Sequence, residues 1–312
     1  MIRYDGLFEI LKAKGLTKTA FAGMVGISSR TLAKLSSGDY VAMKVIENIC
    51  RALNCNVGDI ITITPDAAVT NTLLSVLREE KDMRLKGGLY HQTQIEMTYN
   101  SNHIEGSRLT KDQTRYIFET NTIGLEEDKT INVDDILETA NHFRCIDYAI
   151  DTATDPLSAD IIKEFHRLLK SNTSDGQKEW FAVGDYKKRA NAVEDSPTTP
   201  PAKVADAILS LLAAYAKIPL PSIDDIIAFH YDFESIHPFQ DGNGRVGRLI
   251  AFKECLRFGH VPFIIDEELR LFYYRGLKNW KSERGYLLDT CKSGQDKYQA
   301  VVDYFLKPEE SL

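Results

Sequence analysis

The twelve residues His237–Arg248, HPFQDGNGRVGR, carry the strongest signal in this sequence of 312 residues. Apolar residues at helical spacing precede them from about 222 to 235, and a second helix is expected over about 243–258. Gly242, Asn243 and Gly244 are small residues at the start of that second helix. Several backbone N–H groups there can point to one spot at the positive end of the helix dipole. The segment therefore predicts an anion-binding loop between two helices.

The charged residues of the segment suit a nucleoside triphosphate. Arg245 and Arg248 are three residues apart and can reach the same side of the first turn, as two guanidinium groups on a polyphosphate. Asp241 can hold Mg²⁺ against phosphate oxygens. His237 is a proton acceptor suited to neutral pH. A lone histidine or a Gly-Asn-Gly turn would mean little, but the combination predicts a phosphate-transfer site.

The same twelve positions resemble the signature of the Fic family, with ten of them matching. The resemblance implies a protein adenylyltransferase that moves AMP from ATP to a Ser, Thr or Tyr hydroxyl of a target protein. His237 would remove the proton from that hydroxyl, and Phe239 would pack beneath the loop. Asp241 would hold the Mg²⁺ that bridges the α- and β-phosphates.

The resemblance also assigns the remaining positions of the loop. Gly242, Asn243 and Gly244 would form the anion hole. Arg245 would steady the leaving pyrophosphate, and Arg248 would bind the γ-phosphate. The family signature leaves open the base of the donor nucleotide and the direction of the reaction, because phosphate-binding groups serve ATP, GTP or UTP alike.

A second similarity to the family lies at Ser101–Gly106, SNHIEG, which resembles its inhibitory motif of Ser or Thr, three residues, then Glu. The implied contact is an ion pair between Glu105 and Arg248 that withdraws this arginine from the γ-phosphate. Gly106 is placed to end the helix that carries Glu105. The alternative is an ordinary helix end with a solvated glutamate.

Two further segments resemble parts of the family's substrate site. A hairpin is expected within Trp180–Val193, similar to the flap that clamps a target by strand addition, with Gly184, Tyr186 and Lys187 as target-binding residues. Tyr273 or Tyr274 could line a pocket for the nucleotide base. Packing in the core explains two adjacent tyrosines equally well.

The first 64 residues differ from the rest in charge, with eight basic and five acidic residues against 30 and 40 in the remainder. Four short amphipathic helices are expected between Asp5 and Leu53, and the second and third resemble a Cro/C1-type helix-turn-helix. The resemblance implies DNA contacts by four residues of the third helix: Ser29, Arg30, Thr31 and Lys34. The alternative is a docking or dimerisation module, in keeping with a homodimer.

The predicted fold is all-α: a helical Fic domain bundle with a short β-hairpin flap, plus a small N-terminal helix-turn-helix domain. The expected domains are 1–64 and 65–312, separated by a linker at about 63–67. Within the second, an inhibitory helix is expected at about 90–106 and a catalytic core at about 133–280. Further helices are expected near 67–85, 110–119, 158–170, 202–216, 266–280 and 295–306.

Composition places the chain among globular proteins, with 43% hydrophobic and 27% charged residues. Its most apolar stretch, Ala205–Phe229, is interrupted by charged residues and prolines, which argues against a membrane span. Five scattered cysteines without a C-x-x-C pair favour a reducing cytoplasm. Two other functions stay open: a nucleotide-responsive DNA-binding transcriptional regulator, and a Fic enzyme with another donor or with deAMPylation activity.

Overall fold

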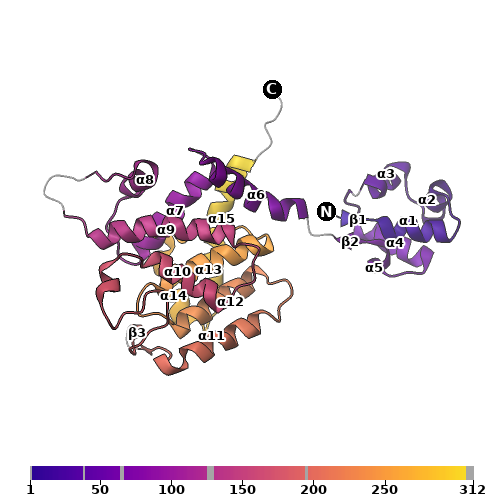
Figure 1. The fold of residues 1–312 in the computed structure, drawn as a ribbon. Coiled ribbons are helices and arrows are strands. Elements are labelled where there is room, and N and C mark those ends of the chain that lie inside the picture. The colour runs from indigo at the N-terminus through magenta and orange to yellow at the C-terminus, as the bar shows by residue number, and fades with distance from the viewer. Residues whose placement is uncertain (1, 38, 64–66, 125–129, 194–195, 307–312) are drawn as a thin grey trace. The chain divides into compact units, whose positions relative to one another are not determined.

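The computed structural model describes residues 2–37, 39–63, 67–124, 130–193 and 196–306, and helices dominate it (Figure 1). The chain divides into two compact units, Met1–Thr70 and Asn71–Leu312, each with its own hydrophobic core. The all-α prediction is confirmed, since the strands of the described residues are two pairs of two residues each. The linker residues Thr64, Pro65 and Asp66 lie outside the described part.

The first unit is a cluster of five short helices: α1 (Asp5–Ala13), α2 (Lys18–Val25), α3 (Ser29–Ser37), α4 (Met43–Leu53) and α5 (Val57–Ile60). The strands β1 (Ile2–Arg3) and β2 (Thr62–Ile63) pair antiparallel. Local chemistry explains the tight turn between α2 and α3. Gly26 takes a φ of 73°, and Ser28 Oγ accepts the N–H of Thr31 at 3.1 Å to cap α3. The sequence reading missed α5 and the strands because such short elements show no period.

The second unit is a helical bundle: α6 (Ala67–Met83), α7 (Leu89–Ile104), α8 (Lys111–Thr120), α9 (Val133–Asp151), α10 (Ala159–Leu169), α11 (Pro201–Tyr215), α12 (Ile223–Ile236), α13 (Asn243–Phe258), α14 (Glu267–Asn279) and α15 (Gly285–Leu306). A 3₁₀ turn, η1, spans Ser174–Gln177. α13 packs against α7, α9, α10 and α12, and almost all of its side chains are buried (Figure 1). Its N-terminus, where the HPFQDGNGR loop ends, is therefore held from several sides.

Two expectations about this unit are wrong in position. α15 begins at Gly285 instead of near 295. Gly294 lies inside it, and a side chain there would meet the carbonyl oxygen of Ile264 at 2.6 Å, so close packing overrides the low helix propensity of glycine. The hairpin is β3 (Ala192–Val193) with β4 (Ser196–Pro197), so it begins at the end of the expected Trp180–Val193 and extends beyond it. Lys187, Arg189 and Asn191 instead bond to the HPFQDGNGR loop.

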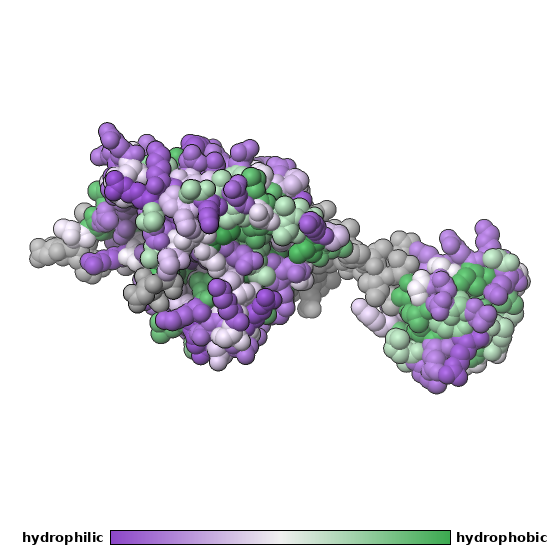
Figure 2. Space-filling view, turned by 90° about the horizontal axis from the view of Figure 1, so that it is seen from below, coloured by the Kyte–Doolittle hydropathy of each residue, from purple (hydrophilic) through white to green (hydrophobic). Residues whose placement is uncertain are grey.

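The surface of the larger unit is mixed in polarity. In Figure 2, hydrophilic side chains cover much of its visible face, with apolar groups between them. Among the described residues, none of the helices has both the length and the hydropathy that a bilayer span requires. The apolar stretch at 205–229 forms parts of α11 and α12 with a turn between them, as its prolines and charges predict.

Candidate active site

The HPFQDGNGR loop connects α12 to α13 and is fixed by its own side chains. α12 ends at His237, which has a left-handed backbone (φ 52°, ψ 62°), and Gly242 precedes α13 with φ 81°. Phe239 is fully buried, and its ring stacks on His166 of α10 with centroids 4.0 Å apart. The Asn243 side chain accepts the Phe239 N–H at 2.8 Å and donates to the Phe239 carbonyl at 2.9 Å. These contacts give the loop one shape.

The first turn of α13 leaves backbone N–H groups for an anion, as every helix start does. Because the Asn243 side chain is engaged with Phe239, its backbone N–H is what it can offer to a phosphate. Gly244 faces the carboxylate of Glu105 so closely that an added Cβ would collide with Oε1. A side-chain carboxylate thus lies against the predicted anion hole.

Arg248 is held by the end of α7. Its Nη2 donates to Glu105 Oε1 at 2.7 Å and to the Ser101 carbonyl at 2.9 Å, and its Nε donates to Ser101 Oγ at 3.0 Å. The side chain of Arg248 is only 6% exposed. Burial alone would lower its pKa, but the Glu105 carboxylate raises it above the usual value. Gly106 follows with φ 96° and ends α7. The ion pair expected from the SNHIEG segment is present.

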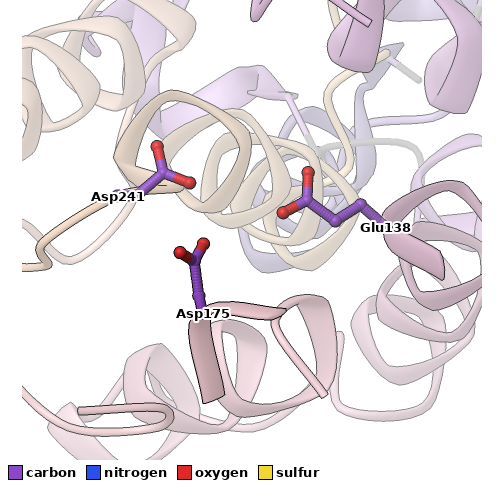
Figure 3. A group of neighbouring side chains, drawn as sticks. All are labelled: Glu138, Asp175 and Asp241. Carbon is purple, nitrogen blue, oxygen red and sulfur yellow. The ribbon is translucent and has the colours of Figure 1, made fainter. Parts of the chain in front are cut away.

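Arg245 lies in a second cluster of charges. Glu138 of α9, Asp175 of η1 and Asp241 of the loop point toward one another (Figure 3), with one oxygen of each within 4.8 Å of the others. Lys170 Nζ contacts all three, at 2.5, 2.5 and 2.7 Å respectively. Arg245 pairs with Glu138 and, at 3.4 Å, with Asp241. Lys170 and Arg245, acting against burial, hold the pKa of Asp241 at about 2.

A cavity of about 250 Å³ lies between the two clusters. Its walls come from the end of α7, the start of α9, Lys170, Asp175 and the loop residues Asp241 and Arg245. Glu105 also lines it. Both arginines of the loop are therefore near one polar cavity, each already paired with carboxylates from elsewhere in the chain.

The acidic cluster fits a magnesium ion through Asp241. Carboxylate oxygens are the ligands that Mg²⁺ prefers, and it commonly takes one or two of them together with substrate phosphates and water. The Asp241 side chain is 53% exposed, whereas Glu138 and Asp175 are less exposed and already share the Lys170 ammonium group. Asp241 is the member of the cluster that can face a bound triphosphate.

His237 lies at the opposite end of the loop from Arg245. Burial lowers the pKa of His237, the nearby Lys187 ammonium lowers it further, and Glu105 and Asp241 act in the opposite direction. The net shift favours the neutral imidazole. A neutral imidazole near pH 7 is the form that can accept a proton.

Of the three expected flap residues, Gly184 lies against α10, and Tyr186 and Lys187 lie against the loop. The N–H of Gly184, which has φ 77°, donates to His166 Nδ1 at 3.0 Å, and the Tyr186 ring lies 6.0 Å from that of Phe239. Lys187 is 3% exposed, its N–H donates to the Pro238 carbonyl at 2.9 Å, and burial lowers the pKa of its ammonium group to about 8. Its side chain does not reach the surface, so it is not placed to touch a target.

The two tyrosines proposed for a base pocket do not line the cavity. Tyr273 is 1% exposed, and its hydroxyl bonds to His230 Nε2 at 2.6 Å, so packing in the core accounts for it. Tyr274 donates to the carbonyl of Ile104 at 2.9 Å and steadies the end of α7 next to Glu105. The sequence reading missed Glu138 and Lys170, because single residues on distant helices carry no local pattern.

The residues expected to contact DNA lie on α3. Ser29, Arg30 and Lys34 are exposed, and Thr31 is half-buried with its hydroxyl 3.0 Å from that of Ser28. They form part of the outer surface of the first unit. The structure holds the helix in the geometry of a helix-turn-helix.

Family models agree with this division of the chain. Residues 156–254 match the Fic/DOC family, and residues 7–66 match the Cro/C1-type HTH DNA-binding domain. The chain carries both domains. The Fic match includes α10, α12, the HPFQDGNGR loop and most of α13, whereas Ser101, Glu105 and Glu138 of the site precede it.

Relatives named as protein adenylyltransferases share part of the chain. The protein adenylyltransferase Fic of Nematostella vectensis is 31% identical over 189 residues, which is 57% of this chain and 41% of that protein. Protein adenylyltransferase fic-1 of Caenorhabditis elegans is 28% identical over 195 residues, covering 61% and 37%. The matches thus cover about two fifths of the length of these relatives.

Solved structures share the fold. A Fic domain containing signaling protein from Bacteroides thetaiotaomicron superposes with a TM-score of 0.62 at 23% identity, covering 78% of this chain and 98% of that one. Fic-1 from C. elegans superposes with a TM-score of 0.55 at 20% identity, covering 95% and 91%. At this identity the likeness establishes the helical Fic fold.

Proposed function

We propose that the chain is an autoinhibited protein adenylyltransferase, which moves AMP from ATP to a Ser, Thr or Tyr hydroxyl of a target protein. One observation carries the proposal: Glu105 pairs with Arg248 and lies against Gly244, at the spot where the loop would bind a triphosphate. A carboxylate in an anion site is a competitor for the anion. The naming of the relatives as protein adenylyltransferases supports the reaction class.

The chemistry follows from the positions of the groups. The target hydroxyl oxygen forms a bond to the α-phosphorus, His237 accepts the hydroxyl proton, and the bond from the α-phosphorus to pyrophosphate breaks. The helix start at 242–244 and Arg245 stabilise the negative charge on the phosphates. Mg²⁺ held by Asp241 supplies further charge neutralisation when bound. Positioning and charge stabilisation account for most of the catalysis in such transfers.

Glu105 restrains the reaction by holding Arg248. Arg248 is buried, so removing Glu105 frees the Nη2 N–H that it engages, which can then bind a γ-phosphate. Breaking one side of a buried ion pair costs about 3–5 kcal/mol, so the restraint can be strong. A released Glu105 would have to move away from Gly244 as well. The five free cysteines agree with a cytoplasmic location for this enzyme.

The test is intact-mass measurement after incubation with Mg²⁺ and each nucleoside triphosphate in turn. We expect Glu105→Gly to modify itself or added proteins with AMP at least about tenfold faster than the wild type, since an ion pair of this kind is worth more than 1.4 kcal/mol. Glu105→Gly/His237→Ala is the matched control and should add no mass. Equal rates in wild type and Glu105→Gly would discard the restraint, and no mass gain with any nucleotide would discard the transferase.

A second function, nucleotide-responsive DNA binding, is favoured by the exposed Arg30 and Lys34 on α3 and by the match of residues 7–66. It would use the first unit, with the Fic domain as the nucleotide sensor. Selection from random double-stranded DNA, with and without ATP and Mg²⁺, tests it. An enriched sequence whose affinity changes with ATP would establish a regulator, whereas no enrichment would leave the first unit as a docking module.

A further inference from the structure

Lys187 is a buried cation beside the catalytic loop that the reaction scheme leaves without a task. Its side chain is 3% exposed, and the partners of Nζ are neutral: Asn191 Oδ1 at 2.7 Å and Thr198 Oγ1 at 2.6 Å. Burying an ammonium group is costly unless its N–H donors are used. The burial of this cation is therefore best explained by the groups that its ammonium group holds in place.

The two partners of Lys187 lead directly to the loop. Asn191 Nδ2 donates to the Phe239 carbonyl at 3.2 Å, the same carbonyl that accepts from the Asn243 side chain. Thr198 Oγ1 lies 2.5 Å from Asn191 Oδ1 and 3.0 Å from the Asn191 carbonyl oxygen, and its single proton can go to either, which helps to fix the orientation of the Asn191 amide. The ammonium group completes this network through its bonds to Asn191 and Thr198.

The backbone of Lys187 makes a second attachment to the same loop. Its N–H donates to the carbonyl of Pro238, the residue that follows His237. His237 has a left-handed backbone conformation, which is unfavourable for a residue with a Cβ and persists only where neighbours enforce it. The carbonyls of Pro238 and Phe239, both fixed by the 187–198 segment, are the nearest anchors after His237.

We propose that Lys187 is a positioning residue, whose buried ammonium group orders Asn191 and Thr198 so that residues 187–191 hold the loop and the imidazole of His237 in place. The inference rests on the proposed adenylyl transfer. Residues 187–191 would then support the HPFQDGNGR loop from within the enzyme, in addition to any contact with the target.

A consequence for protonation follows from the charges around His237. Lys187, Glu105 and Asp241 are the charged groups that act on its imidazole, from the 187–198 segment, the end of α7 and the loop. Lys187 disfavours the imidazolium form, whereas the two carboxylates favour it. Replacing Lys187 by a neutral side chain therefore raises the pKa of His237, and the base form then appears at higher pH.

The first test compares Lys187→Met with Lys188→Met, both in the Glu105→Gly background. Lys188 is the exposed neighbour and provides the matched control. We expect Lys187→Met to lower kcat about tenfold or more with KM for ATP within about twofold, because a mispositioned base affects the chemical step. The acid limb of the pH profile of kcat/KM should move up by roughly half a unit. In Lys187→Arg, kcat and the acid limb of the pH profile should both return most of the way to the values of the parent.

The second test does not depend on activity. An NMR titration of the histidine rings, with His237 assigned by its loss in His237→Ala, should show a raised pKa of His237 in Lys187→Met compared with Lys188→Met. If Lys187→Met has the kcat and the His237 pKa of Lys188→Met, the inference is wrong. If the Glu105→Gly parent transfers no nucleotide, the proposed function fails, and the titration alone decides on Lys187.

A third variant covers the case in which Lys187→Met does not fold, judged by circular dichroism. Asn191→Ala removes the bridge to Phe239 but keeps the ammonium group. We expect it to lower kcat about tenfold with little change in the pKa of His237, since the loop is loosened and the charge is kept. An Asn191→Ala enzyme with the kcat of its parent would overturn the positioning role.

Discussion

The two units of the chain differ in what they bury. In the described part of the first unit every buried side chain is hydrophobic, Tyr4 included, and the charged residues lie at the surface. The second unit buries several charged side chains: Lys170, Lys187, Arg245, Arg248, Lys253 and Glu254. Because burying a charge is unfavourable without compensating partners, each of these residues marks a place where something other than core packing decides the sequence.

The comparison also shows that a buried charge does not by itself indicate a site. Lys170 and Lys187 bond to the HPFQDGNGR loop, and Arg245 and Arg248 lie near the start of α13, which follows it. Lys253 and Glu254 instead pair with each other at 2.9 Å inside α13, and Lys253 Nζ donates to the Asp155 carbonyl at 2.6 Å. This pair ties α13 to the turn after α9. The Lys253–Glu254 pair therefore stabilises the fold. Stability measurements can distinguish it from the buried charges at the HPFQDGNGR loop.

The largest expected effect is on the Lys253–Glu254 pair. Lys253→Met should destabilise the second unit by about 3–5 kcal/mol, because it leaves the buried Glu254 carboxylate without its ammonium partner. Both tryptophans, Trp180 and Trp280, belong to this unit, so urea unfolding followed by tryptophan fluorescence measures its stability.

The control for that variant is Lys292→Met, which removes the exposed pair of Lys292 with Asp224 at 2.7 Å. An exposed ion pair contributes about 0–1 kcal/mol, so the urea midpoint should move little. Equal losses in the two variants would mean that burial of the Lys253–Glu254 pair has no energetic weight.

The next effect concerns the apolar core of the first unit. Leu35 is 1% exposed, and Leu35→Ala should destabilise that unit by about 3 kcal/mol through lost burial and a cavity. Circular dichroism should show an earlier loss of helix, while tryptophan fluorescence, which reports on the second unit, should keep its midpoint. Met43→Ala, at a residue that is 70% exposed, should change neither signal. A fluorescence midpoint that falls with Leu35→Ala would show that the two units unfold together.

A pH-dependent effect comes from Glu234, a buried acid whose charge interacts with Arg248. Burial raises the pKa of Glu234 to about 8, against a partial opposing effect of Arg248, and Oε1 of Glu234 is buried without a hydrogen-bond partner. The folded state thus keeps a proton that the unfolded state has lost above its usual pKa near 4.5. Stability from this group is complete below about pH 4.5 and is lost as the pH rises to about 8, by up to roughly 1 kcal/mol per pH unit.

Glu234→Gln isolates this contribution, since the glutamine stays neutral throughout. The difference in urea midpoint between Glu234→Gln and the wild type should grow in favour of the variant from pH 5 to about pH 8. The comparison of two proteins at each pH removes the common contributions of the buried histidines His142, His166 and His230. A difference that does not vary with pH would show that Glu234 ionises normally.

Local patterns account for what the sequence predicted well. The helix starts at Thr17 and Ser222 and the loop from His237 to Arg248 are set by residues within a few positions of each other. The Glu105–Arg248 contact could be predicted because the SNHIEG segment is itself a local pattern. Its partners are 143 residues apart, yet each belongs to a recognisable motif.

Contacts between unpatterned residues account for what the sequence did not predict. Glu138 and Lys170 come from separate helices and meet at Asp241 only in the folded chain. The hairpin was misplaced for a similar reason: it was expected from the resemblance to the family's flap, but Lys187, Arg189 and Asn191 bond to Pro238, Gln240 and Phe239 of the loop. These contacts are tertiary and leave no local pattern in the sequence.

The smallest expected effect is on the surface of the first unit. The charged residues of this unit lie at its surface, so any DNA binding by it should depend on exposed side chains. Arg30→Ala/Lys34→Ala removes two exposed cations from α3 without touching the core, so the unit should keep its stability. We expect DNA affinity to fall about tenfold and the salt dependence to lose roughly two phosphate contacts, since each neutralised phosphate adds about 0.9 to the slope. Lys44→Ala on α4, where Lys44 pairs with Glu47 at 3.0 Å, should leave the DNA affinity and its salt dependence unchanged.

Because phosphate contacts carry no sequence information, the loss of affinity in the double variant should be the same on specific and random DNA. If the double variant binds DNA as the parent does, α3 is not the DNA-binding surface and serves another partner. The proposed chemistry would then rest on the buried charges of the second unit.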